Sequence, residues 1–301
     1  MLQSFVLSGR LPRFTIWRCL GCGLGRTDPP PSDPYAAEAA LGDMSPGTED
    51  LRLSSNIDTF ASPWAEEIAR ALIVERVPTE VLDIGCGEGD LVAILQGKGF
   101  SASGIELRPR AVHLARQLRK LPVEIGSIDS FLQNPRFVGT IVLSHVLEHL
   151  PDPLEAIRAL AKHTTALVIA VPNSLSARAL VEWANCPGAF AYAPQEHVWQ
   201  MTPAAVARLY QGAGLRLTYL RCHPLRPRRR SLLETARAML KKNSSPSVRA
   251  SRDKDDAESS RRRGFFRKAC WQICDRTLLL VENWIPIPWL ADQVIAIGSL
   301  A

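Results

Sequence analysis

The sequence predicts a doubly wound α/β fold with a mostly parallel sheet, on two observations. From Glu80 onward, short apolar runs alternate with amphipathic stretches, which is the pattern of repeated strand–helix–strand units. The first apolar run, residues 81–84, leads through Gly85, Gly87 and Gly89 directly into a helical pattern. A glycine-rich loop in that place marks the ligand-binding edge of such a sheet.

The elements follow from the period of the apolar residues. Strands are expected at residues 81–84, 102–106, 123–125, 140–143, 166–171, 215–220 and 293–297, and helices at about 64–74, 90–98, 110–119, 153–163 and 203–213. Ser62 is the expected N-cap of the first helix, before Pro63 at its first position. Gly214 is expected to end the helix at 203–213.

The charge of the chain is unevenly distributed. The net charge is +6, but residues 221–301 carry 17 Lys and Arg against 8 Asp and Glu. Residues 226–264 form a basic insertion, and within it residues 241–263 have almost no large apolar side chains, so part of it is expected to be disordered. Polyanionic partners therefore concern this tail and not the core.

Seven scattered cysteines argue against a disulfide framework and for a reducing compartment. The N-terminal residues show no apolar stretch typical of a secretory signal, and no run approaches the length that spans a bilayer. A cytoplasmic location is the expectation.

The glycine loop carries acids. In DIGCGEGD, the third glycine of the dinucleotide fingerprint would fall on Asp90, and Glu88 and Asp90 beside a helix N-terminus would repel a pyrophosphate. A cationic or zwitterionic ligand suits this loop better. Glu106 ends the next strand, where a carboxylate can accept both hydroxyls of a ribose.

These blocks, DIGCGEG, GIEL, IVLSHVLEHLPDP, VIAVPN and QEHVWQMTP, resemble the class I methyltransferases that use S-adenosylmethionine (SAM). The resemblance covers about residues 60–220. It is closest to the bacterial group that includes ubiquinone-pathway O-methyltransferases and enzymes of surface-glycan clusters. It implies a Rossmann-like sheet of seven strands with the last one antiparallel, a SAM-binding core at residues 35–225 with a lid at about 172–200, and residues 265–301 as a C-terminal helix and strand that complete the sheet.

The resemblance also implies roles for single residues. Asp83, Gly85, Cys86 and Gly87 would border the methionine end of SAM, with Glu106 and Leu107 at the ribose. Ser127 and Ile128 would flank the adenine, although relatives often have an acid at Ser127, for which Asp129 could substitute. With Ser144 and His145 added, the expected cofactor-binding set is Asp83, Gly85, Cys86, Gly87, Glu106, Leu107, Ser127, Ile128, Ser144 and His145.

Two histidine motifs are candidates for chemistry. His145, Glu148 and His149 match a zinc-peptidase pattern, but Pro151 and Pro153 leave no room for the long helix that pattern needs. Some relatives hold a divalent cation with an acid at the first position. His145 replaces that acid here, so we expect no metal and expect Glu148 and His149 to shape the pocket floor. His197, in the lid, is the first candidate for the base that deprotonates an acceptor hydroxyl, and His149 is the second.

Cys19 and Cys22 form one half of a zinc ribbon in the N-terminal extension, residues 1–34. Related methyltransferases carry a full four-cysteine ribbon before a similar proline-rich segment. One pair cannot close a tetrahedral site by itself, and Cys270 and Cys274 are candidates for completing it. A degenerate ribbon is the expectation.

The expected reaction is methyl transfer from SAM to a hydroxyl of a sugar or lipid-linked glycan. A quinone or phenol is the alternative acceptor, and a non-catalytic partner-binding subunit is the alternative from another class. The basic tail, with its tryptophans, predicts peripheral contact with an anionic membrane. Nucleic acid is a weaker candidate because no base-methylation motif of the Asn-Pro-Pro-Tyr type is present.

Overall fold

The computed structural model describes residues 2–7, 14–31, 63–176, 179, 196–223 and 291–300. The chain divides into one unit of residues 1–225 and 288–301 and a second of residues 226–287. The second unit, which includes the whole basic insertion, lies outside the described residues, as do Ser62 and the helix expected after residue 264.

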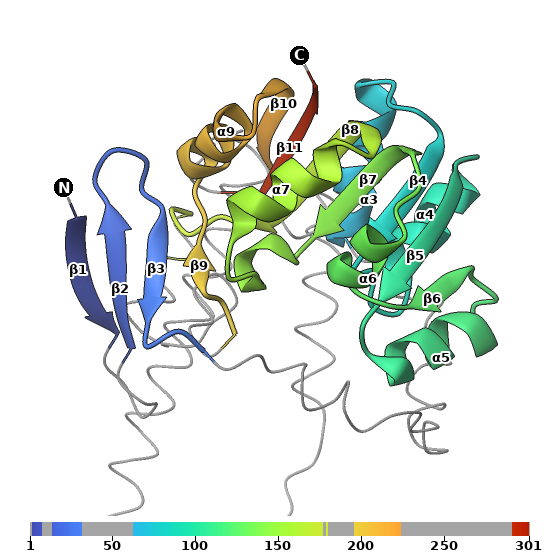
Figure 1. The fold of residues 1–301 in the computed structure, drawn as a ribbon, viewed down its shortest axis with the longest axis horizontal. Coiled ribbons are helices and arrows are strands. Elements are labelled where there is room, and N and C mark those ends of the chain that lie inside the picture. Colours follow the sequence, from blue (N-terminus) through green and yellow to red (C-terminus); the bar gives the residue numbers. More distant parts are fainter. Residues whose placement is uncertain are drawn as a thin grey trace, which may run out of the picture. The chain divides into compact units, whose positions relative to one another are not determined.

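A seven-stranded sheet forms the centre of the first unit (Figure 1). Its spatial order is β10-β11-β8-β7-β4-β5-β6. The strands are β4 (Glu80–Ile84), β5 (Ser101–Glu106), β6 (Val123–Ile125), β7 (Val138–Ser144), β8 (Thr164–Pro172), β10 (Leu215–His223) and β11 (Gln293–Leu300). Strands β4 to β8 pair in parallel, and β11 pairs antiparallel with both β8 and β10. The predicted sheet, including its antiparallel last strand, is confirmed.

Helices cover both faces of this sheet, which is the doubly wound arrangement (Figure 1). Helices α3 (Pro63–Val74), α4 (Asp90–Gly97) and α5 (Pro109–Gln117) pack on one face. Helices α6 (Ile128–Gln133), α7 (Pro153–Ala161) and α9 (Pro203–Gly212) pack on the other, together with the short 3-10 helix η2 (Leu147–His149). Gly214 has φ +74° just after α9, so the predicted C-terminal glycine is confirmed.

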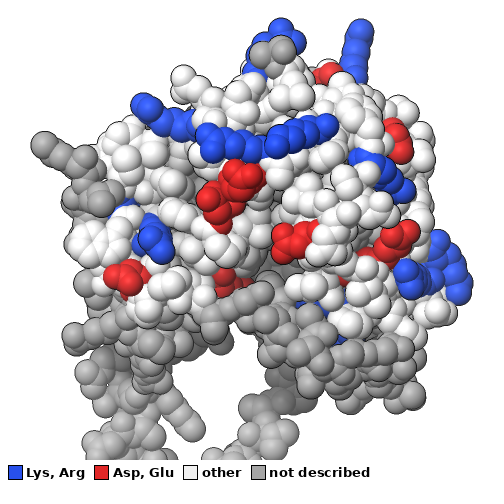
Figure 2. Space-filling view, in the orientation of Figure 1, with Lys and Arg blue, Asp and Glu red and all other residues white. Residues whose placement is uncertain are grey.

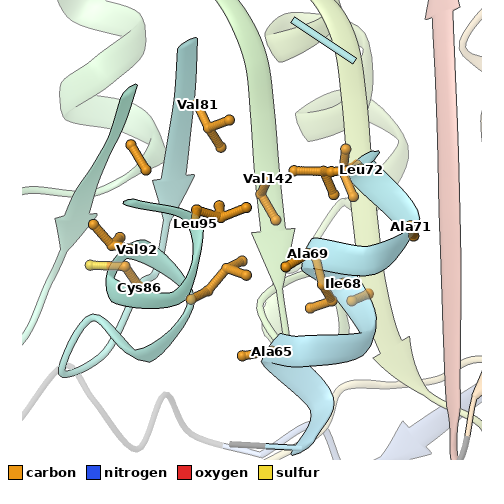
Figure 3. Packing of buried hydrophobic residues seen from close by; sticks show 14 of the residues in the cluster. Ala65, Ile68, Ala69, Ala71, Leu72, Val81, Cys86, Val92, Leu95 and Val142 are labelled. Carbon is orange, nitrogen blue, oxygen red and sulfur yellow. The ribbon is translucent and has the colours of Figure 1, made fainter. Parts of the chain in front are cut away.

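The two cores explain the apolar periods of the sequence. On the first face, Ile68 and Leu72 of α3 point toward Val81 and Val142 on β4 and β7 (Figure 3). On the second face, Tyr210 of α9 is fully buried, and its hydroxyl lies within hydrogen-bond distance of backbone carbonyls of both β8 and β11. Strands β7 and β8 are buried on both faces, as continuous apolar runs predict.

A second, four-stranded sheet was not predicted. The strands β1 (Leu2–Leu7), β2 (Phe14–Cys19) and β3 (Gly25–Asp28) form an antiparallel sheet, and the two-residue strand β9 (Trp199–Gln200) adds to its edge. The register pairs Gly25 with Gln200 and Arg26 with Trp199. The N-terminal extension is thus joined to a segment that lies far from it in the sequence.

The surface of the described residues carries charges of both signs. On the face in Figure 2, Lys and Arg side chains form a row near the upper edge, and Asp and Glu side chains lie below it. None of the described helices combines the length and the apolar character needed to cross a bilayer.

Candidate functional site

The glycine loop follows β4 and opens α4. Gly85, Gly87 and Gly89 all have positive φ, at 81°, 57° and 83°. A Cβ on Gly85 would lie 2.3 Å from Cγ2 of Val146, so close packing against the loop after β7 requires glycine there. Among the described residues, a Cβ on Gly87 would meet Arg108 alone, at 3.6 Å, so this part of the loop leaves its backbone accessible.

Two buried carboxyl groups lie at the carboxyl ends of neighbouring strands. Glu106, at the end of β5, accepts hydrogen bonds from the backbone N–H of Gly87 (2.7 Å) and from the N–H (2.9 Å) and Nε (3.0 Å) of Arg108. Asp83, on β4, is 2% exposed, and its Oδ1 has no hydrogen-bond partner in the described part of the chain. Burial and the charge of Glu106 raise the pKa of Asp83 to about 8. A cation at this edge would relieve the unfavourable ionisation.

The end of β7 lies beside this acid pair, since β7 pairs with β4. Ser144 is buried, and no described residue forms a hydrogen bond with its hydroxyl. His145 follows with φ 56°, a left-handed conformation that is uncommon outside glycine and is often found at functional sites. Its ring meets the edge of Trp64 on α3, with the ring centroids 5.4 Å apart.

A cluster of one carboxylate and three histidines extends from this point. Glu148, on η2, is 1% exposed, and its Oε1 lies 3.5 Å from Nδ1 of His145. His149 packs edge-to-face against His197, with centroids 4.9 Å apart. Three possible metal-ligand atoms lie within 4.8 Å of one another, one each from Glu148, His149 and His197. The two candidate bases, which are distant in sequence, are therefore neighbours in the fold.

The two candidate bases differ in burial. His197 is 5% exposed, and desolvation lowers its pKa to about 4, although the charge of Glu148 works in the opposite direction. Burial would raise the pKa of Glu148, but the hydrogen bond and charge of His145 and the charges of His197 and His149 outweigh it and lower that pKa. Glu148 is thus a buried carboxylate, and His197 is a neutral imidazole at neutral pH.

The tautomer of His149 follows from its hydrogen bond. Nδ1 of this half-buried ring lies 2.9 Å from the carbonyl oxygen of Glu196. A carbonyl oxygen can only accept, so Nδ1 carries the proton and donates it. In the neutral ring, Nε2 is then the nitrogen that can take up a proton.

The comparisons with known proteins agree with this geometry. Residues 57–220, more than half of the chain, match the methyltransferase domain family. The chain belongs to this family. The methyltransferase domain that the glycine loop and Glu106 predict is thereby confirmed.

The chain is also similar to curated proteins and to solved structures. It is 30% identical over 92 residues to the ubiquinone biosynthesis O-methyltransferase of Nitrosomonas europaea and 31% identical over 108 residues to that of Bordetella parapertussis. These matches cover 27% and 33% of this chain, and they span only 37% and 42% of the relatives' lengths.

Two solved structures show a weaker likeness over more of the chain. The SAM-dependent methyltransferase of Archaeoglobus fulgidus is 16% identical with a TM-score of 0.46, and the match covers 78% of this chain and 93% of that one. The magnesium protoporphyrin IX methyltransferase of Synechocystis PCC 6803 is 18% identical with a TM-score of 0.42, and the match covers 63% and 89%.

The acid pair of the methyltransferase fits SAM, which supplies a methyl group on a positively charged sulfur. The buried Oδ1 of Asp83, which has no hydrogen-bond partner among the described residues, favours a cation at the loop, whereas Glu106 is already paired with Arg108. Beside Gly87, a Cβ would meet Arg108 alone among the described residues, at 3.6 Å, so there is space for a ligand to approach the backbone. The residues present therefore suit this cofactor better than an anionic dinucleotide.

Other residues expected at the cofactor have local structural partners. Ser127 is the N-cap of α6 and forms a capping box with Ser130, so its hydroxyl is engaged in the helix end. Ile128 and Leu107 are half-buried, and Asp129 is exposed. Cys86 is buried against Gly104, and burial together with the charges of Asp83 and Glu106 raises its pKa, so it is a packing residue and not a nucleophile.

Sequence reasoning missed two contributors to the site. Arg108 holds Glu106 through its side chain and its backbone, and Trp64 contacts His145 from α3. An arginine shortly after the strand-end acid was a usable signal. The contact between Trp64 and His145, which belong to distant parts of the sequence, left no signal in one sequence.

A metal could be held by Glu148, His149 and His197, which are the candidate metal ligands among the described residues. One oxygen and two nitrogen donors suit zinc or a similar transition metal better than magnesium. η2 spans Leu147–His149, so the described chain has no long helix of the zinc-peptidase kind at this motif. The expectation that the site works without a metal stays a prediction.

Cys19 is the last residue of β2, and Cys22 lies in the turn between β2 and β3. Hydrogen bonds from the backbone N–H groups of Cys22 and Gly21 lower the pKa of Cys19. Cys270 and Cys274, the candidates for completing a ribbon, lie outside the described residues.

Proposed function

We propose that this methyltransferase methylates a hydroxyl group and that His149 is the base. The observation that carries the proposal is the hydrogen bond from His149 Nδ1 to the Glu196 carbonyl, beside the buried carboxylate of Glu148. That bond orients the ring and directs proton uptake to Nε2, and a carboxylate nearby stabilises the imidazolium that forms. His197, whose pKa is about 4, is a poorer proton acceptor at neutral pH, so the order of the two sequence-based candidates is reversed.

The proposed reaction conserves atoms and charge. The acceptor O–H loses its proton to Nε2 of His149 while its oxygen forms a bond to the methyl carbon. The bond between that carbon and the sulfonium breaks, and its electron pair stays on sulfur, which leaves as a neutral thioether. Alignment of the two substrates supplies much of the acceleration, because the sulfonium is already a good leaving group.

The proposed acceptor is a hydroxyl of a sugar or of a lipid-linked glycan. Support comes from the N-terminal segment, whose cysteine pair and proline-rich run resemble those of methyltransferases from surface-glycan clusters. The basic tail would add attraction to an anionic membrane that carries such an acceptor, at about 1 kcal/mol for each Lys or Arg near the surface.

A quinone-type phenol is the second candidate, which the names of the curated relatives favour. Phenols are also weaker bases once deprotonated than sugar alkoxides, so an imidazole removes their proton more easily. Both candidates place the reacting hydroxyl at His149.

Kinetics on the full chain test the proposal. With labelled SAM and a panel of catechols, demethylated quinols and lipid-linked sugars, His149→Gln should lower kcat by about 10²- to 10⁴-fold and leave SAM affinity unchanged. His163→Gln is the matched control. His163 lies just before β8, at the amino ends of the parallel strands, whereas His149 follows the carboxyl end of β7. Equal kcat in the two variants would exclude His149 as the base. SAM binding without transfer to any acceptor would favour a non-catalytic subunit.

Vesicle sedimentation tests the membrane contact separately. Binding to anionic vesicles should weaken as salt is added, and it should disappear when Arg228, Arg229, Arg230, Arg261, Arg262 and Arg263 are replaced by Ser. Absence of binding at low salt would exclude this attachment, and binding to RNA in place of vesicles would favour a nucleic-acid partner.

A further inference from the structure

The segment that carries His197 is held from two sides. On one side lies the loop after β7, which carries Glu148 and His149. Here His149 donates to the carbonyl of Glu196, and Nε1 of Trp199 donates to the carbonyl of Leu150 at 2.9 Å. On the other side, the hairpin of β2 and β3 binds the same segment. Residues 196–202 are therefore held between the loop after β7 and the β2–β3 hairpin.

Thr27, on β3, makes the central contacts of the second side. Its hydroxyl donates to the carbonyl oxygen of His197 at 2.7 Å, and its backbone N–H donates to the carbonyl of Val198 at 2.9 Å. The hydroxyl also accepts from Nε2 of Gln200 at 3.1 Å. Thr27 is fully buried, so water does not replace these bonds if the hydroxyl is removed.

The β2–β3 hairpin packs closely against residues 196–202. A Cβ on Gly25 would lie 2.9 Å from Cβ of Gln200, and the hydroxyl of Thr202 donates to the carbonyl of Cys22 at 2.6 Å. Thr202 also caps α9 by accepting from the N–H of Ala205. The turn that holds the cysteine pair is thus attached to the N-cap of a core helix.

We propose that the β2–β3 hairpin belongs to the catalytic site and that Thr27 is a positioning residue for the two histidines. The proposal rests on the proposed function of His149. The bond to the His197 carbonyl sets the position of that backbone, and the ring of His197 packs on His149 with centroids 4.9 Å apart. A displaced His197 changes the orientation of the base, and small displacements at a reacting group reduce rates strongly.

Replacement of the hydroxyl tests the proposal. Thr27→Val keeps the size of the side chain and removes the bond, whereas Thr27→Ser keeps the bond. Thr140→Val is the matched control, because Thr140 is also fully buried and its hydroxyl donates to the carbonyl of Pro78 at 2.9 Å, away from the histidines. Thr27→Val should lower kcat at least 10-fold and change its pH profile, with SAM affinity unchanged. Thr27→Ser and Thr140→Val should keep both near wild type.

NMR signals of the imidazole rings do not depend on turnover. They therefore test the positioning role of Thr27 separately from the proposed role of His149 as the base. The chain has six histidines, so ¹⁵N-histidine labelling of the full chain gives few enough imidazole signals to assign. Thr27→Val should shift the signals of His149 and His197, and Thr140→Val should leave them in place. Shifted signals in a chain that transfers no methyl group would support the positioning role and count against the proposed function.

The opposite results would overturn the proposal. If Thr27→Val matched Thr140→Val in kcat, in pH profile and in imidazole signals, Thr27 would be merely structural. Thr27→Cys, with a weaker thiol donor in the same place, is the milder variant if the valine variant folds poorly, and it should give intermediate shifts. Wild-type signals in a folded Thr27→Cys variant would also count against the proposal.

Discussion

His149 and Thr27 bind the carbonyl oxygens of two consecutive residues from opposite sides. His149 donates to Glu196 at 2.9 Å, and Thr27 donates to His197 at 2.7 Å. One donor belongs to the loop after a strand of the parallel sheet, and the other belongs to the N-terminal hairpin. The cluster of Glu148 and the histidines is thus held together by three separate parts of the chain.

Loss of the strand-end acid should weaken cofactor binding. Glu106→Ala removes the buried carboxylate that we expect to bind the ribose, and calorimetry should show SAM affinity reduced by about 1.5–3 kcal/mol. Asp129→Asn is the control, because Asp129 is exposed, and it should bind like wild type. Tight binding of NADH with no response to SAM would contradict the assignment of the loop.

Asp83 should make stability depend on pH. Its pKa rises from 3.8 to about 8 in the folded chain, so the folded state keeps a proton that the unfolded state releases. Stability without cofactor should therefore fall as pH rises between about 4 and 8. Asp83→Asn should remove this slope and raise the melting temperature more at pH 8 than at pH 5. Parallel melting profiles of the two proteins would show that Asp83 ionises normally.

SAM binding should be coupled to the same proton. A cationic ligand favours the ionised form of Asp83, so binding at pH 7 should release a proton. Calorimetry in buffers of different ionisation enthalpy measures this release, and Asp83→Asn should abolish it. Equal binding enthalpies in all buffers would count against the contact between Asp83 and the cofactor.

His197 should destabilise the fold in acid. Burial lowers its pKa from 6.5 to about 4, so the unfolded state takes up a proton that the folded state does not. The stabilisation is complete above pH 6.5 and is lost progressively as pH falls toward 4, by about 3 kcal/mol in all at about 1.36 kcal/mol per pH unit. Denaturant unfolding between pH 7 and 4 should show the loss, and His197→Gln should reduce it. An unchanged slope in the variant would place the acid sensitivity elsewhere.

Metal ions should inhibit and not activate. Because we assign proton transfer to the imidazole of His149, dialysis against EDTA should leave kcat unchanged. Zn²⁺ should inhibit by binding the donor atoms of Glu148, His149 and His197, which lie within 4.8 Å of one another. His197→Gln should weaken that inhibition. Loss of activity in EDTA, restored by Zn²⁺, would instead make these residues metal ligands in the reaction.

The sequence predicts the sheet and the cofactor loop because both depend on local patterns. Apolar runs, glycines and the acid at Glu106 are encoded within short windows, and the seven strands lie where those runs are. The cysteine pair at residues 19 and 22 suggests half of a zinc ribbon. In the structure, the carbonyl of Cys22 accepts a hydrogen bond from the hydroxyl of Thr202, and Gly25 pairs with Gln200. A two-residue strand such as β9 has no period to detect.

The order of the two histidines could not be predicted for a similar reason. The motifs place both near the carboxyl edge, and the proposed preference for His149 rests on exposure and hydrogen bonding. The low pKa of His197 depends on burial under segments far away in sequence. The bond from His149 to Glu196 joins two separate motifs, and no spacing rule indicates it.

The pairing of β3 with β9 keeps the contacts of the N-terminal hairpin apart from the residues suited to the methyl donor. The groups suited to the methyl donor come from β4, β5 and β7, whereas the N-terminal hairpin contacts residues 197–202, which carry His197. Under the proposed function, residues of the hairpin other than Thr27 are free to change and so to alter the choice of hydroxyl, while the donor site on the central sheet stays the same. Diversification of acceptors within the lineage is then expected to be recorded in the sequence of the hairpin.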